Sequence, residues 1–215
     1  ALTINQKVLN SNSSRVYNAT TTAAASDITL TNQVSGETLQ LSNSAATSSK
    51  NVGSYSISNL SGVTISDQAG ANASSGALAA NYTLTGGTHS FAINPKAVNI
   101  TGTRQYDGTT NIPASDISGI TGTVNTETLT MSSGLGSTSS ANVGTYNLTD
   151  TSAGTLALGN GSNGGLASNY TLTGGTQDYT ITQRILTSSG SKTYDANTNA
   201  LAADITLSNL VSGET

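Results

Sequence analysis

Carboxylates that recur at fixed spacing are the residues of this 215-residue chain best suited to chemistry. A pair of carboxylates can act as general acid and general base, as in glycoside hydrolysis. The two carboxylate series are Asp27, Asp116 and Asp204, and Glu37, Glu127 and Glu214. Two basic series recur with them, Lys7, Lys96 and Arg184, and Arg15, Arg104 and Lys192. An enzyme has no need to repeat one active site along its chain, so we expect structural ion pairs and turn caps, and no catalytic residues.

Other catalytic and metal-binding sets are poorly represented. The chain has no cysteine, and Gln177 stands where the only histidine, His89, would recur, which leaves no Ser/His/Asp or Cys/His set. A calcium site usually needs several carboxylates together, whereas residues 94–96 and 182–184, at the expected junctions, are basic. Lys7 and Lys96 could each form an isopeptide bond with an asparagine, but Arg184, at the same place in the third unit, cannot form that amide. We therefore predict no cofactor and no metal, with calcium and isopeptide cross-links as minor alternatives.

The composition favours a sheet protein with small cores. Only 8% of residues are charged and 34% apolar, yet the net charge is just −4 and Thr, Val and Ile are plentiful. This fits half-buried strands better than disorder. Seven scattered basic residues cannot displace the counterions of a nucleic acid, and no apolar run approaches the roughly 20 residues of a membrane span. Abundant Ser, Thr and Asn without cysteine is typical of a large exported bacterial protein that folds without disulfides.

A tandem repeat organises the whole chain. The segment Asn81–Thr88 returns unchanged as Asn169–Thr176, and Asn51-Val52-Gly53 returns as Asn142-Val143-Gly144. The tyrosines of a third motif, Tyr17, Tyr106 and Tyr194, are spaced 89 and 88 residues apart. These spacings divide the chain into the end of a preceding repeat (1–5), two repeat domains (6–94 and 95–182) and part of a third (183–215). The period of about 88 residues exceeds that of a solenoid coil and equals one small domain, so we expect a tandem array of domains.

Strand and turn signals dominate each unit. Residues 97–101 alternate apolar and polar positions, as a half-buried strand does. Gly174-Gly175 interrupts such an alternation and predicts a hairpin turn or a bulge. Tyr106-Asp107-Gly108 is a turn signal. The same place is occupied by Asn18-Ala19 in the first unit and by Asp195-Ala196 in the third, which keep the Asx residue but lack the glycine. We therefore expect the turn to need its side-chain cap more than a left-handed backbone. The predicted fold class is all-β, an elongated array of small β-sandwich or β-grasp-like domains, each with about six or seven short strands and essentially no helix.

The aromatic residues recur with the repeat. The chain has eight Tyr and one Phe. They fall at four shared places, Tyr17, Tyr106 and Tyr194; Tyr55 and Tyr146; Tyr82 and Tyr170; and Phe91 and Tyr179. A platform that stacks sugars or bases would need exposed aromatics peculiar to one unit. We therefore expect these rings to be core residues with their hydroxyls at the surface.

Four motifs occur in a fixed order along the second unit. They are Arg104-Gln105-Tyr106-Asp107-Gly108-Thr109-Thr110, Asn125-Thr126-Glu127, Asn142-Val143-Gly144 and Asn169-Tyr170-Thr171-Leu172. Together they resemble the YDG/MBG-type repeats that occur in tandem in large filamentous-haemagglutinin-like adhesins of Gram-negative bacteria. The resemblance covers essentially the whole chain, and the first unit departs from it at Asn18-Ala19 and the third at Ala196-Asn197. The structural motif residues that it implies are Tyr17, Tyr106, Asp107, Gly108, Tyr194, Asp195, Asn51, Gly53, Asn142, Gly144, Asn81, Tyr82, Asn169 and Tyr170.

The resemblance also implies a role. It implies non-catalytic stalk or spacer repeats of a secreted or surface-attached adhesin, placed outside the cell and serving adhesion or biofilm formation. The expected partners are neighbouring repeats of the same chain, with host or matrix glycans or other adhesin copies as further candidates. The alternative is that the repeats bind glycan or neighbouring copies directly through weak multivalent contacts. Glycosylation of Asn-x-Ser/Thr sequons, such as the one at Asn81, is a further alternative, although such sequons arise by chance in this composition.

Overall fold

The structure is a computed structural model and describes residues 1–68, 77–148 and 154–215. Every long element within these residues is a strand, and the helical elements are single 3-10 turns. The turns are η1 (Ala25–Asp27), η2 (Ser58–Leu60), η4 (Ala79–Asn81), η5 (Ala114–Asp116), η6 (Ala167–Asn169) and η7 (Ala202–Asp204). Two compact units form, unit 1 from residues 1–96, 124–126 and 165–171, and unit 2 from residues 97–123, 127–164 and 172–215.

Unit 1 contains the strands of the first repeat. They are β1 (Lys7–Val8), β2 (Asn10–Val16), β3 (Thr22–Ala24), β4 (Leu30–Thr31), β5 (Leu39–Ala46), β6 (Gly53–Ser56), β7 (Val63–Asp67), β8 (Tyr82–Thr83) and β9 (His89–Asn94), joined by β18 (Tyr170–Thr171) from later in the chain. A four-stranded sheet has the order β4-β2-β9-β6, and a three-stranded sheet has the order β3-β5-β7. The short strand β1 pairs in parallel with β8.

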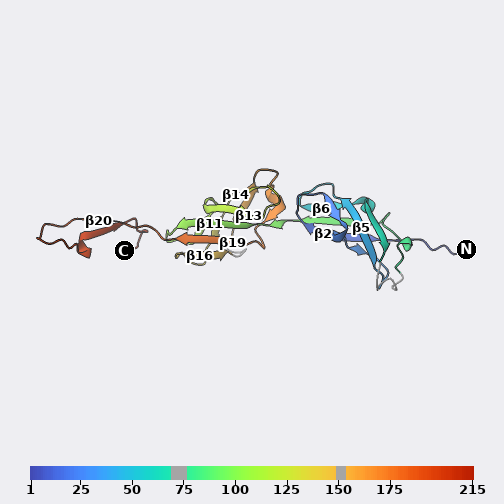
Figure 1. Cartoon of the computed structure of the whole chain (residues 1–215), viewed down its shortest axis with the longest axis horizontal. Helices are drawn as coiled ribbons and strands as arrows, with labels where there is room; N and C mark the ends of the chain where they lie inside the picture. The colour runs from blue at the N-terminus through green and yellow to red at the C-terminus, as the bar shows by residue number, and fades with distance from the viewer. Residues whose placement is uncertain (69–76, 149–153) are drawn as a thin grey trace. The chain divides into compact units, whose positions relative to one another are not determined.

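Unit 2 builds the same four-stranded sheet. Its strands are β11 (Asn99–Gln105), β12 (Asn111–Pro113), β13 (Ile117–Thr121), β14 (Leu129–Ser133), β15 (Leu135–Ser137), β16 (Gly144–Leu148), β17 (Ala157–Asn160), β19 (Gln177–Thr182), β20 (Thr187–Gly190) and β21 (Ile205–Ser208), while β10 (Lys96–Ala97) has one residue in each unit. The sheet order is β13-β11-β19-β16 (Figure 1), and β12-β15, β14-β17 and β20-β21 are two-stranded. The all-β fold is therefore confirmed.

The first and last long strands of each repeat lie side by side and parallel. β2 pairs with β9, beginning with Ser11 opposite His89, and β11 pairs with β19, beginning with Ile100 opposite Gln177. Strands that pair in parallel need a long crossover between them, and here the crossover is the whole middle of the repeat. The last strand then lies in the centre of its sheet, between the first strand and β6 or β16.

Alternate residues of these last strands form the core. Tyr179 and Ile181 of β19 are fully buried and pack with Ile112. Phe91 and Ile93 of β9 are buried at the same places in unit 1. This two-residue alternation is that of a strand with one face in the core, and it agrees with the predicted burial of the recurring rings.

One aromatic position contradicts the prediction that all these rings are core residues. Tyr17 is 1% exposed, but Tyr194, at the same place in the third unit, is 89% exposed. The backbone amide of Tyr17 donates to the Asn94 carbonyl at 2.9 Å, and that of Tyr106 donates to the Thr182 carbonyl at 2.8 Å. The end of the last strand thus covers this position in both repeats. Tyr194 belongs to the partial third repeat, in whose described residues β20 pairs with β21 alone.

The turn after each of these tyrosines has a left-handed residue in all three units, in addition to the side-chain cap that the sequence predicts to matter more. Ala19 and Ala196 have φ angles of 62° and 60°, close to the 78° of Gly108. An alanine in this conformation costs about 1 kcal/mol or more. The turn therefore requires the left-handed residue in all three units, whether or not a glycine supplies it.

The Gly-Gly pair of each repeat is neither a hairpin turn nor a bulge, because the strands that flank Gly174-Gly175, β18 and β19, lie in different sheets. The first glycine has a φ of +79°, and a Cβ on the second would lie 2.0 Å from the Val98 carbonyl oxygen. In unit 1 a Cβ on Gly87 would likewise lie 1.9 Å from the Leu9 carbonyl oxygen. The second glycine is needed where the chain passes against the backbone just before the repeat's first long strand.

Gly175→Ala should destabilise unit 2 more than Gly174→Ala. At position 175 the new methyl group overlaps a backbone oxygen, which costs about 3 kcal/mol. At position 174 nothing lies within 4 Å, so only the positive φ is penalised, by about 1 kcal/mol. Urea denaturation followed by circular dichroism measures both losses. Equal losses would show that the approach to Val98 imposes no constraint.

Candidate functional site

The Lys/Arg-x-Tyr-Asp motif closes its own turn. In unit 2 Arg104 forms an ion pair with Asp107 and donates to the Thr109 hydroxyl at 2.9 Å. The Asp107 carboxylate accepts the Thr109 amide at 2.9 Å. Lys192 and Asp195 form the same ion pair at 2.9 Å. These charges hold the turn, as the sequence predicts for ion pairs and turn caps.

The first unit forms the same turn without a carboxylate. The Asn18 side-chain oxygen accepts the Thr20 amide at 3.2 Å. Arg15 donates to the carbonyls of Thr20 and Thr22, and its guanidinium lies 5.6 Å from the centre of the Phe91 ring. A neutral amide therefore satisfies the position, which is not what an acid–base role would require.

Asp107→Ala and Asp107→Asn separate the cap from the charge. The alanine variant loses the cap and should lower the free energy of unfolding by about 1 kcal/mol, whereas the asparagine variant keeps it, as Asn18 does, and should lose less. Burial alone would raise the pKa of Asp107, but hydrogen bonds from Thr109 and Arg104 outweigh it and lower the pKa. A lowered pKa in the folded state adds stability above about pH 4 that is lost as the pH falls. Urea denaturation at neutral and acid pH should therefore show that acid lowers the free energy of unfolding less in the asparagine variant than in the wild-type protein. If both variants lose the same free energy of unfolding at neutral pH, the side-chain cap does not stabilise the turn.

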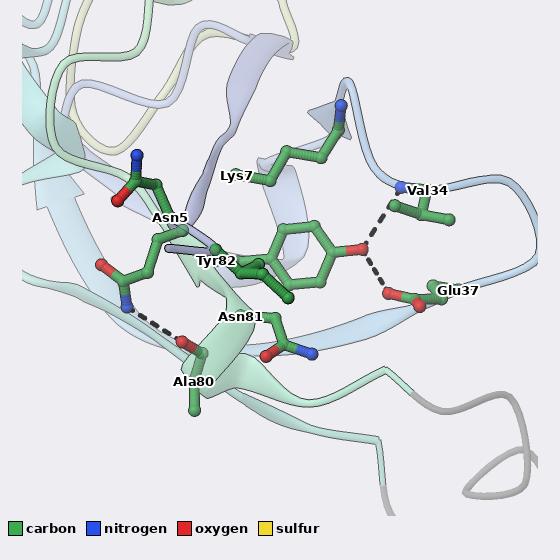
Figure 2. Close-up of a pocket in the computed structure, with 9 residues that line it drawn as sticks. Asn5, Lys7, Val34, Glu37, Ala80, Asn81 and Tyr82 are labelled. Carbon is green, nitrogen blue, oxygen red and sulfur yellow. Dashed lines mark hydrogen bonds between the residues drawn. The ribbon is translucent and has the colours of Figure 1, made fainter. Parts of the chain in front are cut away.

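A pocket of about 390 Å³ in unit 1 gathers the side chains closest in type to an acid–base site (Figure 2). Among the described residues that line it, Glu37 is the one carboxylate. Figure 2 shows the Tyr82 hydroxyl between this carboxylate, to which it donates, and the Val34 amide, which donates to it at 3.3 Å. In the same view the Lys7 side chain extends away from Asn81.

The tyrosine–glutamate bond in this pocket is suited to holding structure. The hydrogen bond to Glu37, with burial adding to it, raises the pKa of Tyr82. The hydroxyl therefore keeps its proton and is a poor base, while the carboxylate is already engaged. In the second repeat the Val124 amide donates to the Tyr170 hydroxyl at 3.0 Å. In the first repeat this tyrosine thus holds the loop after β4 against the short strand β8. In the second repeat it holds the equivalent loop, after β13, against β18.

The aspartate series also binds a tyrosine, in unit 2. The Tyr179 hydroxyl donates to the Asp116 carboxylate at 2.8 Å. Burial, followed by this hydrogen bond, raises the pKa of Tyr179. Phe91 takes the same place in unit 1, so the pair stabilises one repeat and is not needed by both.

Tyr179→Phe should make the stability of unit 2 less sensitive to alkali. The unfolded chain loses the tyrosine proton near pH 10 while the folded state retains it, so this stability is fully present below pH 10 and is lost as the pH rises above it. At neutral pH the lost hydrogen bond should cost about 1 kcal/mol. Tyr146→Phe, which removes a hydroxyl bonded to the Asn142 carbonyl, is the matched control and should keep the alkaline decline. Urea denaturation between neutral pH and pH 11 tests this, and an unchanged slope in Tyr179→Phe would refute it.

His89 and Gln177 make the same buried contact. The His89 Nε2 lies 2.9 Å from the Leu84 carbonyl oxygen, and the Gln177 side-chain amide donates to the Leu172 carbonyl at 2.7 Å. The other ring nitrogen of His89 lies 3.2 Å from the Ser11 hydroxyl oxygen. Both side chains are buried at the first position of β9 or β19. Sequence reasoning aligned the two residues but missed this shared role, which needs a donor and not an imidazole.

Residues 165–171 bring three of the recurring motifs together in unit 1. The fully buried Asn169 accepts the Val52 amide at 2.9 Å and donates to the Asn51 side-chain oxygen at 3.1 Å. The Tyr170 ring meets the Tyr17 ring edge to face, with centroids 5.4 Å apart. The motif tyrosine, the Asn-Val-Gly motif and the Asn-Tyr motif therefore form one polar and aromatic cluster.

The Asn-Val-Gly motif itself starts a strand in each unit. β6 and β16 begin at its glycine. Two residues later Tyr55 and Tyr146 fold their hydroxyls back to donate to the carbonyls of Asn51 and Asn142, each at 2.7 Å. These partly buried tyrosines close the motif as a small local loop.

The part of the chain that the structure describes holds no group of three or more His, Cys, Asp or Glu side chains that could bind a metal ion. No helix within it is long and apolar enough to cross a membrane. The fold and the contacts above define a tandem all-β repeat protein.

A family model described as the YDG domain matches residues 1–90 and again residues 92–183. The chain therefore belongs to the YDG domain family. No curated protein and no solved structure matches it.

Proposed function

We propose that this chain is part of a non-catalytic stalk in a large secreted or surface-attached bacterial adhesin that serves adhesion or biofilm formation. The observation that carries the proposal is the parallel pairing of the first and last long strands in each repeat. A chain under tension is pulled at the start of the first strand and at the end of the last. Those points lie at opposite ends of a parallel pair, so the pull shears the strands lengthwise and loads their hydrogen bonds together.

The recurring polar residues support the same role. The basic residues and Asx caps close turns, the tyrosines clamp loops, and His89 or Gln177 fixes the start of the last strand. Side chains that are engaged in this way in each repeat hold the fold and are not available to a substrate. Identical units then add length in proportion to their number.

The proposal includes the finer architecture and the placement. Each repeat packs as a small β-sandwich or β-grasp-like domain, and the repeats follow one another as an elongated array whose partners are neighbouring repeats of the chain. Placement outside the cell is supported by the composition, which combines many Ser, Thr and Asn with no cysteine.

Pulling one repeat in two directions tests the stalk. Because the chain has no cysteine, handles can be placed as a pair of exposed cysteines. Asn99→Cys with Thr182→Cys pulls β11 and β19 at opposite ends, and Asn99→Cys with Thr176→Cys pulls them at the same end. We expect single-molecule unfolding forces several-fold higher for the first pair, because bonds loaded together resist more than bonds broken one after another.

Pulling the whole chain by its termini gives the second readout. Two unfolding events are expected, each adding about 30 nm, since about 88 residues extend by roughly 3.5 Å each. Equal, low forces in both handle geometries would overturn the stalk, because the repeats would then yield under load whatever the direction of pull.

A further inference from the structure

One segment of unit 1 comes from the second repeat. Residues 165–171 belong to unit 1, whereas β17, which precedes them in the chain, and β19, which follows them, belong to unit 2. Within unit 1 Asn169 bonds to Val52 and Asn51, which lie 117 and 118 positions earlier in the chain. The chain therefore leaves unit 2, contributes a short segment to unit 1, and then returns to unit 2.

The Asn169 side chain uses both of its hydrogen-bonding groups in this contact. Its oxygen accepts the Val52 backbone amide at 2.9 Å, and its nitrogen donates to the Asn51 side-chain oxygen at 3.1 Å. The side chain is fully buried, so an alanine in its place would leave the Val52 amide without this acceptor. An ionised aspartate could accept but could not donate. The position therefore needs a group that does both.

Tyr170 adds an aromatic contact beside the two hydrogen bonds. Its ring meets that of Tyr17 edge to face, and both tyrosines are buried. Such a pair of rings contributes more than the burial of its area alone. The Tyr170 hydroxyl also accepts the Val124 amide at 3.0 Å. Tyr17, Asn51 and Val52 thus form an acceptor surface on the first repeat, and Asn169 and Tyr170 are the residues that occupy it.

Unit 2 holds both ends of the segment that occupies this acceptor surface. β17 ends at Asn160 and pairs with β14, while β19 begins at Gln177 and pairs with β11 and β16. A segment whose two ends are already held loses less conformational freedom when it binds, which raises its effective concentration. When unit 2 unfolds, the same residues become part of a long free chain. The entropy of ordering them then opposes the contact with unit 1.

We propose that the acceptor surface of the first repeat binds the Asn-Tyr motif of the second repeat, and that this contact couples the folding of the two units. Unit 1 is most stable while unit 2 is folded, because unit 2 then holds Asn169 and Tyr170 ready to bind. A coupling free energy is reciprocal, so folded unit 1 stabilises unit 2 to the same extent. Tandem repeats joined in this way gain stability from each neighbour.

Hydrogen exchange of the whole chain, followed by mass spectrometry, tests the acceptor surface, with β2 and β9 reporting on unit 1. Asn169→Ala should speed exchange in these strands by about tenfold or more, because two hydrogen bonds are lost. Ser168→Ala, at an exposed position of the same 3-10 turn, should leave exchange unchanged. Asn51→Ala combined with Asn169→Ala should speed exchange less than the product of the single effects, because both variants remove the same bond. Equal exchange in Asn169→Ala and Ser168→Ala overturns the acceptor surface.

A change inside unit 2 tests the coupling. Ile181 is fully buried in β19, so Ile181→Ala, or Ile181→Val if alanine prevents folding, should unfold unit 2 at a lower urea concentration than the wild type requires. At urea concentrations where only the variant's β11 and β16 exchange freely, its β2 and β9 should exchange about tenfold faster than those of the wild type.

The variant Asn169→Ala provides the control for this comparison. In a chain that already carries Asn169→Ala, Ile181→Ala should speed exchange in β2 and β9 much less, because the contact that transmits the effect is gone. Exchange in β2 and β9 that stays unchanged while unit 2 unfolds overturns the coupling. The coupling names a contact between neighbouring repeats of the proposed stalk, but it does not depend on the direction of pull. The two proposals therefore fail separately.

Discussion

Each repeat closes by laying its last long strand beside its first, β9 along β2 and β19 along β11. The chain between them has to return to its starting point before the sheet can form, and the sequence-distant pairing must offset the entropy of that loop. The last strand also carries two of the largest fully buried side chains, Phe91 and Tyr179. The core and the four-stranded sheet of each repeat thus depend on a single strand pair.

A chain with so few charged residues holds this closure together with hydrogen bonds. The same position is served by different side chains, Asn18 or Asp107 in the turn and His89 or Gln177 at the start of the last strand. What stays constant is the donor or acceptor and its backbone partner. Different side chains that keep the same contact in this way are typical of residues that maintain a fold.

The sequence period and the compact units do not coincide. Residues 165–171, near the end of the second sequence repeat, belong to unit 1, where Asn169 bonds to Asn51 and Val52. The residues that the repeat conserves most strictly are therefore partly those that bind across sequence boundaries. In the second repeat Asn-Tyr-Thr-Leu contributes both to its own short strand, β18, and to this cluster.

The sequence by itself determined the all-β class, the repeat, the turn caps and the set of recurring rings, because these depend on local residue type and spacing. It did not determine the left-handed φ of Ala19, the close approach of Gly175 to Val98, or the shared contact of His89 and Gln177. Burial and close approach are set by which distant strand lies alongside, and only the tertiary structure decides that.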